Sequence, residues 1–365
     1  MLTTDLLGAS LAQLDTLFRA MHEHGASDLH LVAGNPPIMR INGDLVRLKS
    51  PALTDTTLRP LLQEISPPSA WKTFSDTGDV DYGYELEGVA RFRANLFVQK
   101  NGAAGVFRLI PSKILSCTDL GLPDEISRLA YLRQGLVLVT GPTGSGKSTT
   151  LAAIIDEVNR NRTDNLITIE DPIEFIHHGA KALVSHREVG AHTQSFAAAL
   201  RSALREDPDI ILVGEMRDLE TIRLALEAAA TGHLVFGTLH TLNSAKTVDR
   251  IIEVFPSREQ PQIRSTLADA LKAVIAQTLF KRADQSGRIA ALELMMCTPA
   301  ISNLIREGKT FQIPSALQTG RKDGMRTMDS SIVELLAAGK IDPIDASEKI
   351  LNEELLAPYL SRTGM

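Results

Sequence analysis

The 365-residue chain contains only two cysteines, Cys117 and Cys297, which lie far apart in the sequence. Because no Cys-x-x-Cys pair is present, the sequence excludes a cysteine-based zinc site and indicates two free thiols in a reducing compartment. No apolar run approaches the roughly 20 residues of a membrane-spanning helix, and the first residues show no signal-peptide pattern. We therefore expect a cytoplasmic protein without direct membrane insertion.

Basic residues are fewer than acidic ones, and aromatic residues are few. The net charge is −6, and aromatic residues make up 4% of the chain. A nucleic-acid-binding surface needs a basic field and, for single strands, aromatic stacking platforms. We expect no nucleic-acid partner, and a nucleic-acid translocase is the weaker alternative. The hydrophobic content of 44% is that of an ordinary globular protein, and the length predicts two or three domains.

A glycine-rich stretch follows the apolar run 136–140 and precedes the helical pattern 149–155, which predicts a buried strand, a loop and a helix. The stretch consists of Gly141, Pro142, Thr143, Gly144, Ser145, Gly146, Lys147, Ser148 and Thr149. Glycines let backbone N–H groups turn toward an anion, and the helix dipole adds positive potential at the same point. Lys147 can reach the terminal phosphates, and the Ser148 hydroxyl can ligate Mg²⁺. The sequence therefore predicts a site for ATP and Mg²⁺.

Three further predicted strands end in polar side chains. Strand 165–169 precedes Glu170 and Glu174, strand 209–213 precedes Glu215, and strand 234–239 precedes His240. Open α/β sheets place their chemistry at the carboxyl ends of their strands. A carboxylate of the first group could position the attacking water, Glu215 could face Mg²⁺, and His240 could sense the γ-phosphate. The alternatives are turn capping around Asp171 and a structural histidine.

Residues 1–110 are predicted to form a small α+β domain on an antiparallel sheet, with a hairpin at Asn42-Gly43 and a meander over 79–110. Arg91 and Arg93 share one strand face at period two, and Arg108 lies on a neighbouring strand. The three arginines form either a solvated surface or contacts to a nucleotide held by another domain or subunit.

Residues 111–134 are predicted to be a linker, and 135–365 an ATPase domain with a C-terminal helical region. Within this domain we expect a helix over 196–206 capped by Thr193, a helix over 219–231 capped by Asp218, and helices over 244–255 and 258–280. A strand over 288–296 and helices over 298–306 and 310–340 follow.

The order and spacing of these motifs resemble those of the type II and type IV secretion ATPases. The matching segments are 141–148, 167–175, 207–218 and 231–241. Segments 300–309 and 318–329 resemble a C-terminal motif of the type IV pilus retraction ATPases within that superfamily. The likeness covers nearly the entire chain, and the four-cysteine insert of the extension ATPases is absent. One departure is Ser302, where the retraction motif usually has arginine.

The resemblance implies an α/β fold with a RecA-like P-loop ATPase domain and a smaller PAS-like N-terminal domain. It also implies a homohexamer that hydrolyses ATP with Mg²⁺ to power pilus retraction and twitching motility. Glu174 would position water, with Glu170 as second choice, Glu215 would fill an atypical Walker B position and His240 the histidine-box position. Arg91, Arg93 and Arg108 would contact the nucleotide.

The implied location is the pilus base, peripheral to the inner membrane, and the implied partners are a platform protein and a paralogous motor ATPase. Because of Ser302, a weakly hydrolysing accessory subunit of the motor is the alternative function.

Overall fold

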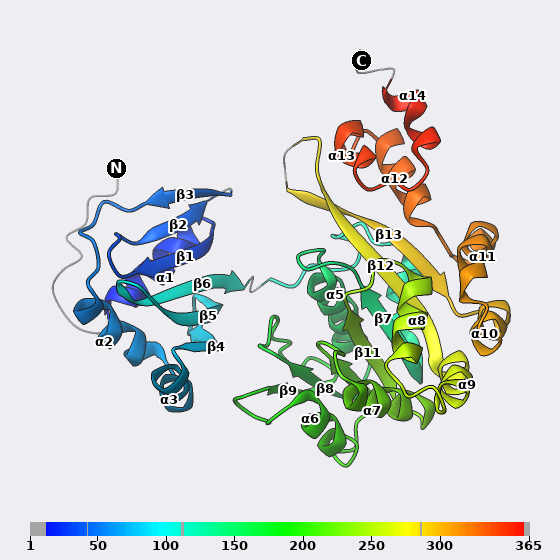
Figure 1. The fold of residues 1–365 in the computed structure, drawn as a ribbon, viewed down its shortest axis with the longest axis horizontal. Helices are drawn as coiled ribbons and strands as arrows, with labels where there is room; N and C mark the ends of the chain where they lie inside the picture. Colours follow the sequence, from blue (N-terminus) through cyan, green and yellow to red (C-terminus); the bar gives the residue numbers. More distant parts are fainter. Residues whose placement is uncertain (1–11, 42, 111–112, 285–286, 361–365) are drawn as a thin grey trace. The chain divides into compact units, whose positions relative to one another are not determined.

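The computed structural model describes residues 12–41, 43–110, 113–284 and 287–360. Contacts divide the chain into one unit formed by Met1–Lys113 with Pro172–Ile176 and a second formed by Ile114–Asp171 with His177–Met365. Figure 1 shows the elements of both units. Among the described residues, no helix has the length and apolar character to cross a membrane.

The first unit is built on a six-stranded antiparallel sheet in the order β3-β2-β1-β6-β5-β4. Its strands are β1 (Ala26–Val32), β2 (Ile38–Ile41), β3 (Asp44–Arg47), β4 (Asp79–Leu86), β5 (Ala90–Gln99) and β6 (Gly102–Ile110), and its helices are α1 (Ala12–Glu23), α2 (Asp55–Ile65) and α3 (Pro68–Thr77). All three helices share one apolar core with the sheet. The predicted α+β fold and meander are confirmed, while Asn42 and residues 1–11 lie outside the described residues.

The second unit contains a seven-stranded sheet in the order β13-β12-β7-β11-β10-β8-β9. These strands are β7 (Gly135–Thr140), β8 (Asn165–Glu170), β9 (Leu183–Glu188), β10 (Ile210–Val213), β11 (Leu234–Leu239), β12 (Leu271–Lys281) and β13 (Arg288–Met296). All neighbouring strands pair in parallel except β12 and β13, so only the edge strand β13 runs antiparallel. The buried, apolar strands 136–140, 166–169 and 210–213 fit this parallel core.

Helices cover both faces of this sheet, and successive strand residues face opposite cores. Leu136 and Leu138 of β7 pack with α6 (Phe196–Ala203), α7 (Leu219–Ala230), α8 (Ser244–Glu253) and α9 (Gln260–Ala270). Val137 and Val139 pack with α4 (Asp124–Arg128), η1 (Leu129–Tyr131) and α5 (Lys147–Asn161). This arrangement buries β7 on both faces and fixes the start of the glycine-rich loop.

The C-terminal helices pack against two parts of the second unit. Helices α10 (Pro299–Arg306) and α11 (Ile313–Thr319) share the apolar core of α8 and α9. Helices α12 (Met328–Ala337), α13 (Pro343–Ser347) and α14 (Ala357–Leu360) pack on the β12–β13 hairpin. Phe280 of β12 lies in a separate apolar core with Ile332 and Leu336 of α12. This core joins the last 30 residues of the described chain to the sheet, so they form part of the second unit.

Contacts assign the residues from Ile114 onward, within the predicted linker, to the second unit, and Ile126 and Leu129 lie in its core. The structure differs from the sequence predictions in two places. The helix predicted over 258–280 ends at Ala270, and the remainder is strand β12. The cap of α6 is Ser195, whose hydroxyl accepts a hydrogen bond from Ala198 N–H at 3.1 Å, and not Thr193.

Candidate functional site

The glycine-rich loop connects β7 to α5 as predicted. Gly141, Gly144 and Gly146 have φ angles of 141°, 77° and 88°, a region that favours glycine. A Cβ on Gly141 would lie 2.3 Å from the Gln277 carbonyl oxygen, so a side chain is excluded there by contact as well. Gly146 precedes α5 without any side-chain cap hydrogen bond. The first-turn N–H groups of α5 therefore have the arrangement that binds a phosphate.

Lys147 is the first residue of α5, and its side chain folds back over the loop. Its Nζ donates hydrogen bonds to the carbonyl oxygens of Gly141 at 2.9 Å and Pro142 at 3.0 Å. The residue is buried, with 9% of its surface exposed. The ammonium group is thus held inside the loop, at the place where a phosphate would need a positive charge.

Gln277 of β12 anchors this loop, and sequence reasoning missed it because the segment was predicted to be helical. Its Nε2 donates to the Ser145 carbonyl at 2.7 Å, and its Oε1 accepts from the Thr150 hydroxyl at 2.8 Å. Only 3% of Gln277 is exposed. One side chain from the neighbouring strand therefore connects the loop to the first turn of α5.

Glu215 and His240 lie together at the carboxyl ends of the adjacent strands β10 and β11. His240 Nε2 is 2.8 Å from Glu215 Oε1, within hydrogen-bond distance. Leu239 pairs with Thr140, so His240 and Gly141 follow neighbouring strand ends. His240 therefore follows the strand next to the one before the loop, Glu215 follows the strand beyond it, and their predicted roles stay predictions.

Glu215 is held as an anion by its neighbours. Burial alone would raise its pKa, but an ion pair with Arg217 and the contact with His240 bring the pKa below its ordinary value. An ionised carboxylate at this sheet edge is a suitable ligand for Mg²⁺, directly or through water. Arg217 was not singled out from the sequence, although it follows the strand-end acid by two residues.

Glu170 ends β8, the strand on the other side of β10. It is buried, and one of its oxygens lies 3.9 Å from Nδ1 of His186 on β9. The same nitrogen is 2.8 Å from the Thr168 hydroxyl, and His186 Nε2 accepts from the His177 backbone N–H at 3.1 Å. The imidazole of His186 is therefore fixed on two sides beside Glu170.

Glu174 lies in the segment Pro172–Ile176, which groups with the first unit. It is half-buried. Its expected role in positioning water therefore stays a prediction.

The three candidate arginines lie on β5 and β6 of the first unit, where Arg93 and Arg108 pair across the strands. Arg91 and Arg93 approach Glu85 and Asp81, each with a nitrogen–oxygen distance of 3.7 Å. Arg108 Nε donates to the buried carboxylate of Asp28 at 2.9 Å. Arg108 is the most accessible of the three, with 68% of its side chain exposed.

The loop, the α5 N-terminus and Lys147 fit a nucleoside triphosphate, because each presents N–H groups to one point. The Ser148 hydroxyl and the Glu215 carboxylate are oxygen donors of the kind that Mg²⁺ uses. Pro142, Thr143 and Thr149 belong to the same loop and helix start. The geometry therefore supports binding and hydrolysis of a nucleotide in the second unit.

Comparison with known proteins agrees with this geometry. The family described as type II/IV secretion system protein matches residues 13–342. The chain is 54% identical over 327 residues to the type IV pilus retraction ATPase PilT of Pseudomonas aeruginosa, covering 90% of this chain and 95% of the relative. It is 50% identical over 321 residues to a twitching motility protein of Neisseria gonorrhoeae, covering 88% of this chain and 86% of that protein.

A solved structure extends the likeness to the fold. The crystal structure of the pilus retraction motor PilT with bound ADP superposes with a TM-score of 0.87 and 43% identity, covering 97% of this chain and all of the other. The parallel sheet with its N-terminal α+β unit is thus the RecA-like fold with an N-terminal domain that the motifs imply. The chain therefore belongs to the type II/IV secretion ATPases, in the branch that contains the pilus retraction motors.

Proposed function

We propose that the chain works as a ring of six that binds MgATP, hydrolyses it and uses the resulting domain closure to withdraw pilin subunits from a type IV pilus. The observation that carries this proposal is the Glu215–His240 pair at the same sheet edge as the Lys147 loop. The similarity to PilT over 90% of the chain supports the retraction activity.

The residues would divide the work as follows. Lys147 and the loop N–H groups hold the phosphates, while Ser148 and Glu215 hold Mg²⁺, which offsets charge on the transferring phosphoryl group. Glu174, with Glu170 as the alternative, orients the attacking water. His240 donates one hydrogen bond to the γ-phosphate, and this hydrogen bond is lost when the γ-phosphate leaves. The chemistry is positioning combined with charge stabilisation.

Arg91, Arg93 and Arg108 would approach the same phosphates from the first unit, of the same or a neighbouring subunit. Each is now paired with an acid of its own sheet. The Arg93–Asp81 pair is exposed at both ends, and such a pair contributes little to stability, so exchanging it for a phosphate contact costs little. This supports the proposed role of Arg93 as an arginine finger.

The proposed location is the cytoplasmic face of the inner membrane at the pilus base, in contact with a platform protein there. A paralogous motor is a further proposed partner, and the chain is 37% identical over 334 residues to the type IV pilus ATPase PilU of P. aeruginosa. That likeness covers 92% of this chain and 87% of the relative.

The test is steady-state ATP hydrolysis by the purified ring and by its Lys147→Ala variant. We expect Lys147→Ala to abolish hydrolysis, because the loop loses its phosphate-neutralising charge. The exposed Lys181→Ala is the matched control and should keep full activity. Wild-type turnover in Lys147→Ala would remove the loop from the mechanism.

The same assay separates the motor from the accessory alternative that Ser302 raises. Ser302 Oγ donates to the Ala268 carbonyl of α9 at 2.9 Å, so it packs within the second unit. A motor hydrolyses ATP on its own, and a strain lacking it carries excess pili and does not twitch. An accessory subunit hydrolyses only weakly by itself.

A further inference from the structure

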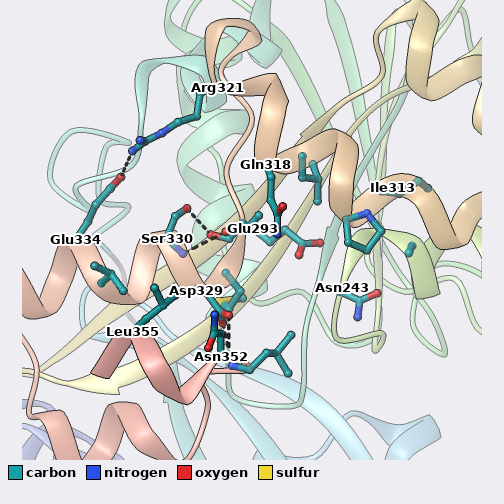
Figure 2. Close-up of a pocket in the computed structure, with 17 residues that line it drawn as sticks. Asn243, Glu293, Ile313, Gln318, Arg321, Asp329, Ser330, Glu334, Asn352 and Leu355 are labelled. Carbon is teal, nitrogen blue, oxygen red and sulfur yellow. Dashed lines mark hydrogen bonds and ion pairs between the residues drawn. The ribbon is translucent and has the colours of Figure 1, made fainter. Parts of the chain in front are cut away.

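A pocket of about 430 Å³ lies between β13, the start of α8 and helices α11 and α12, and its lining includes no residue of the phosphate loop or of the Glu215–His240 pair. Figure 2 shows the side chains that line it, including Asn243, Glu293, Gln318, Arg321 and Asp329. Its size is within the range of sites that bind small molecules or single large side chains. Nothing in the proposed hydrolysis uses it.

Glu293 is the unusual member of this lining. It is a carboxylate in the buried run 291–295 of the edge strand β13, and only 9% of the residue is exposed. Its Oε1 accepts a hydrogen bond from the Ser244 backbone N–H at 2.7 Å. Among the residues that the structure describes, the carboxylate takes its hydrogen bonds from Ser244 and has no ion pair. A buried acid in this state lacks a positive partner.

The other charges around the pocket are already satisfied. Asp329 accepts hydrogen bonds from the backbone N–H groups of Leu351 and Asn352, at 2.9 and 3.0 Å. Arg321 pairs with Glu334, at 3.2 Å. Neither pair supplies a cation to the core carboxylate, so the pocket keeps a net negative charge.

The pKa of Glu293 also reflects the missing cation. Burial raises the pKa of Glu293, the hydrogen bond from Ser244 opposes this, and the nearby Asp329 raises it further. A cation placed in the pocket would relieve both unfavourable effects.

The mouth of the pocket is apolar. Leu351 and Leu355 line it with 85% and 40% of their surface exposed, and Ile313 and Leu317 form the wall. A buried carboxylate beneath apolar walls suits a side chain with an aliphatic stem and a cationic end. The exposed leucines beside it offer contact area for residues that flank such a side chain. A free amino acid would instead bring its own carboxylate toward Asp329 and Glu334.

We propose that this pocket binds an arginine side chain of a partner polypeptide, with the guanidinium on Glu293 and flanking apolar residues on Leu351 and Leu355. The partner segment is thus basic and apolar in alternation. The site is separate from the nucleotide site, and this inference does not depend on the proposed function.

The test uses the full-length protein and the tripeptide N-acetyl-leucyl-arginyl-leucinamide, with binding measured by calorimetry. The matched probe carries citrulline, the neutral analogue of arginine, and free L-arginine is the third probe. We expect saturable binding of the arginine peptide, and binding of the other two probes that is at least about tenfold weaker.

Variants locate the binding. Glu293→Gln keeps an acceptor for Ser244 and removes the charge. It should therefore weaken the binding of the arginine peptide by at least about tenfold. The exposed Glu348→Gln is the charge-matched control and should bind like wild type. Gln318→Trp, at an exposed position of the lining, should block the pocket without altering the core, and serves if Glu293→Gln fails to fold.

Each other result overturns the proposal. Equal binding of the arginine and citrulline peptides would show that Glu293 does not select a cation. If free arginine bound as tightly as the peptide, the flanking residues would contribute nothing, and the pocket would not be a site for a partner polypeptide. Absence of saturable binding to wild type, or full binding to Gln318→Trp, would remove the site.

Discussion

Replacing Gln277 with leucine tests whether the phosphate loop is held in place before nucleotide binds. The substitution keeps the approximate shape of the side chain and removes its hydrogen bonds to Ser145 and Thr150, both at most 3% exposed. Each buried group left without a partner costs about 1–3 kcal/mol, and the leucine recovers about 1 kcal/mol by apolar burial. We expect the free energy of unfolding of the second unit to fall by about 1–5 kcal/mol.

The assay is amide hydrogen exchange resolved by segment, in the absence of nucleotide. Exchange over 141–150 should rise in Gln277→Leu, and the Michaelis constant for ATP should increase. Gln262→Leu, at an exposed position of α9, is the matched control and should change stability by no more than about 0.5 kcal/mol.

A double-mutant cycle sharpens the test. Thr150→Val removes the partner of Gln277 Oε1, so adding it to Gln277→Leu should cost less than the sum of the two single changes. Strict additivity, with unchanged exchange over 141–150, would refute the anchoring role of Gln277.

Three further predictions concern charged groups. His177 is buried, and burial lowers its pKa to about 3, so between pH 6.5 and 3 the unfolded chain binds a proton that the folded chain does not. The free energy of unfolding should therefore fall by up to ~1.4 kcal/mol per pH unit from pH 6.5 toward 3. His177→Gln should flatten that slope in acid-unfolding curves. Glu215 has a lowered folded pKa, so its advantage over Glu215→Gln in urea unfolding should be complete above pH 4.5 and disappear as the pH falls further, and an advantage constant down to pH 3 would contradict the ion pair. Alanine at Arg91, Arg93 or Arg108 should lower kcat by about 10³–10⁵ where that arginine acts as a finger, and small effects at all three would assign them to the surface.

The phosphate loop and the strand-end acids could be predicted because their signals are local. A strand, a loop with three glycines and a helix follow one another within 27 residues, from Gly135 to Asn161. Parallel strands then bring their carboxyl ends to one edge by topology alone. The hydrogen bond between His240 and Glu215 follows from this rule, although its distance does not.

Strand β12 could not be predicted because its sequence is compatible with a helix. Residues 271–276 are Leu-Lys-Ala-Val-Ile-Ala, and no glycine or proline separates them from α9. Pairing with β7 on one side and β13 on the other decides the outcome, and this is tertiary information. Gln277 was missed for the same reason. The cap of α6 was misplaced because Thr193 and Ser195 are both good capping residues two positions apart.

The hydrogen bond from Ser244 to Glu293 has a mechanical consequence. Only Thr241, Leu242 and Asn243 separate that bond from His240, a span of roughly 14 Å at full extension. The hydroxyls of Thr241 and Thr247 lie 2.7 Å apart, so this segment is also attached to helix α8. A displacement of the β12–β13 hairpin would therefore reach the imidazole through only three residues, and movement of the C-terminal helices would be linked to the state of the nucleotide.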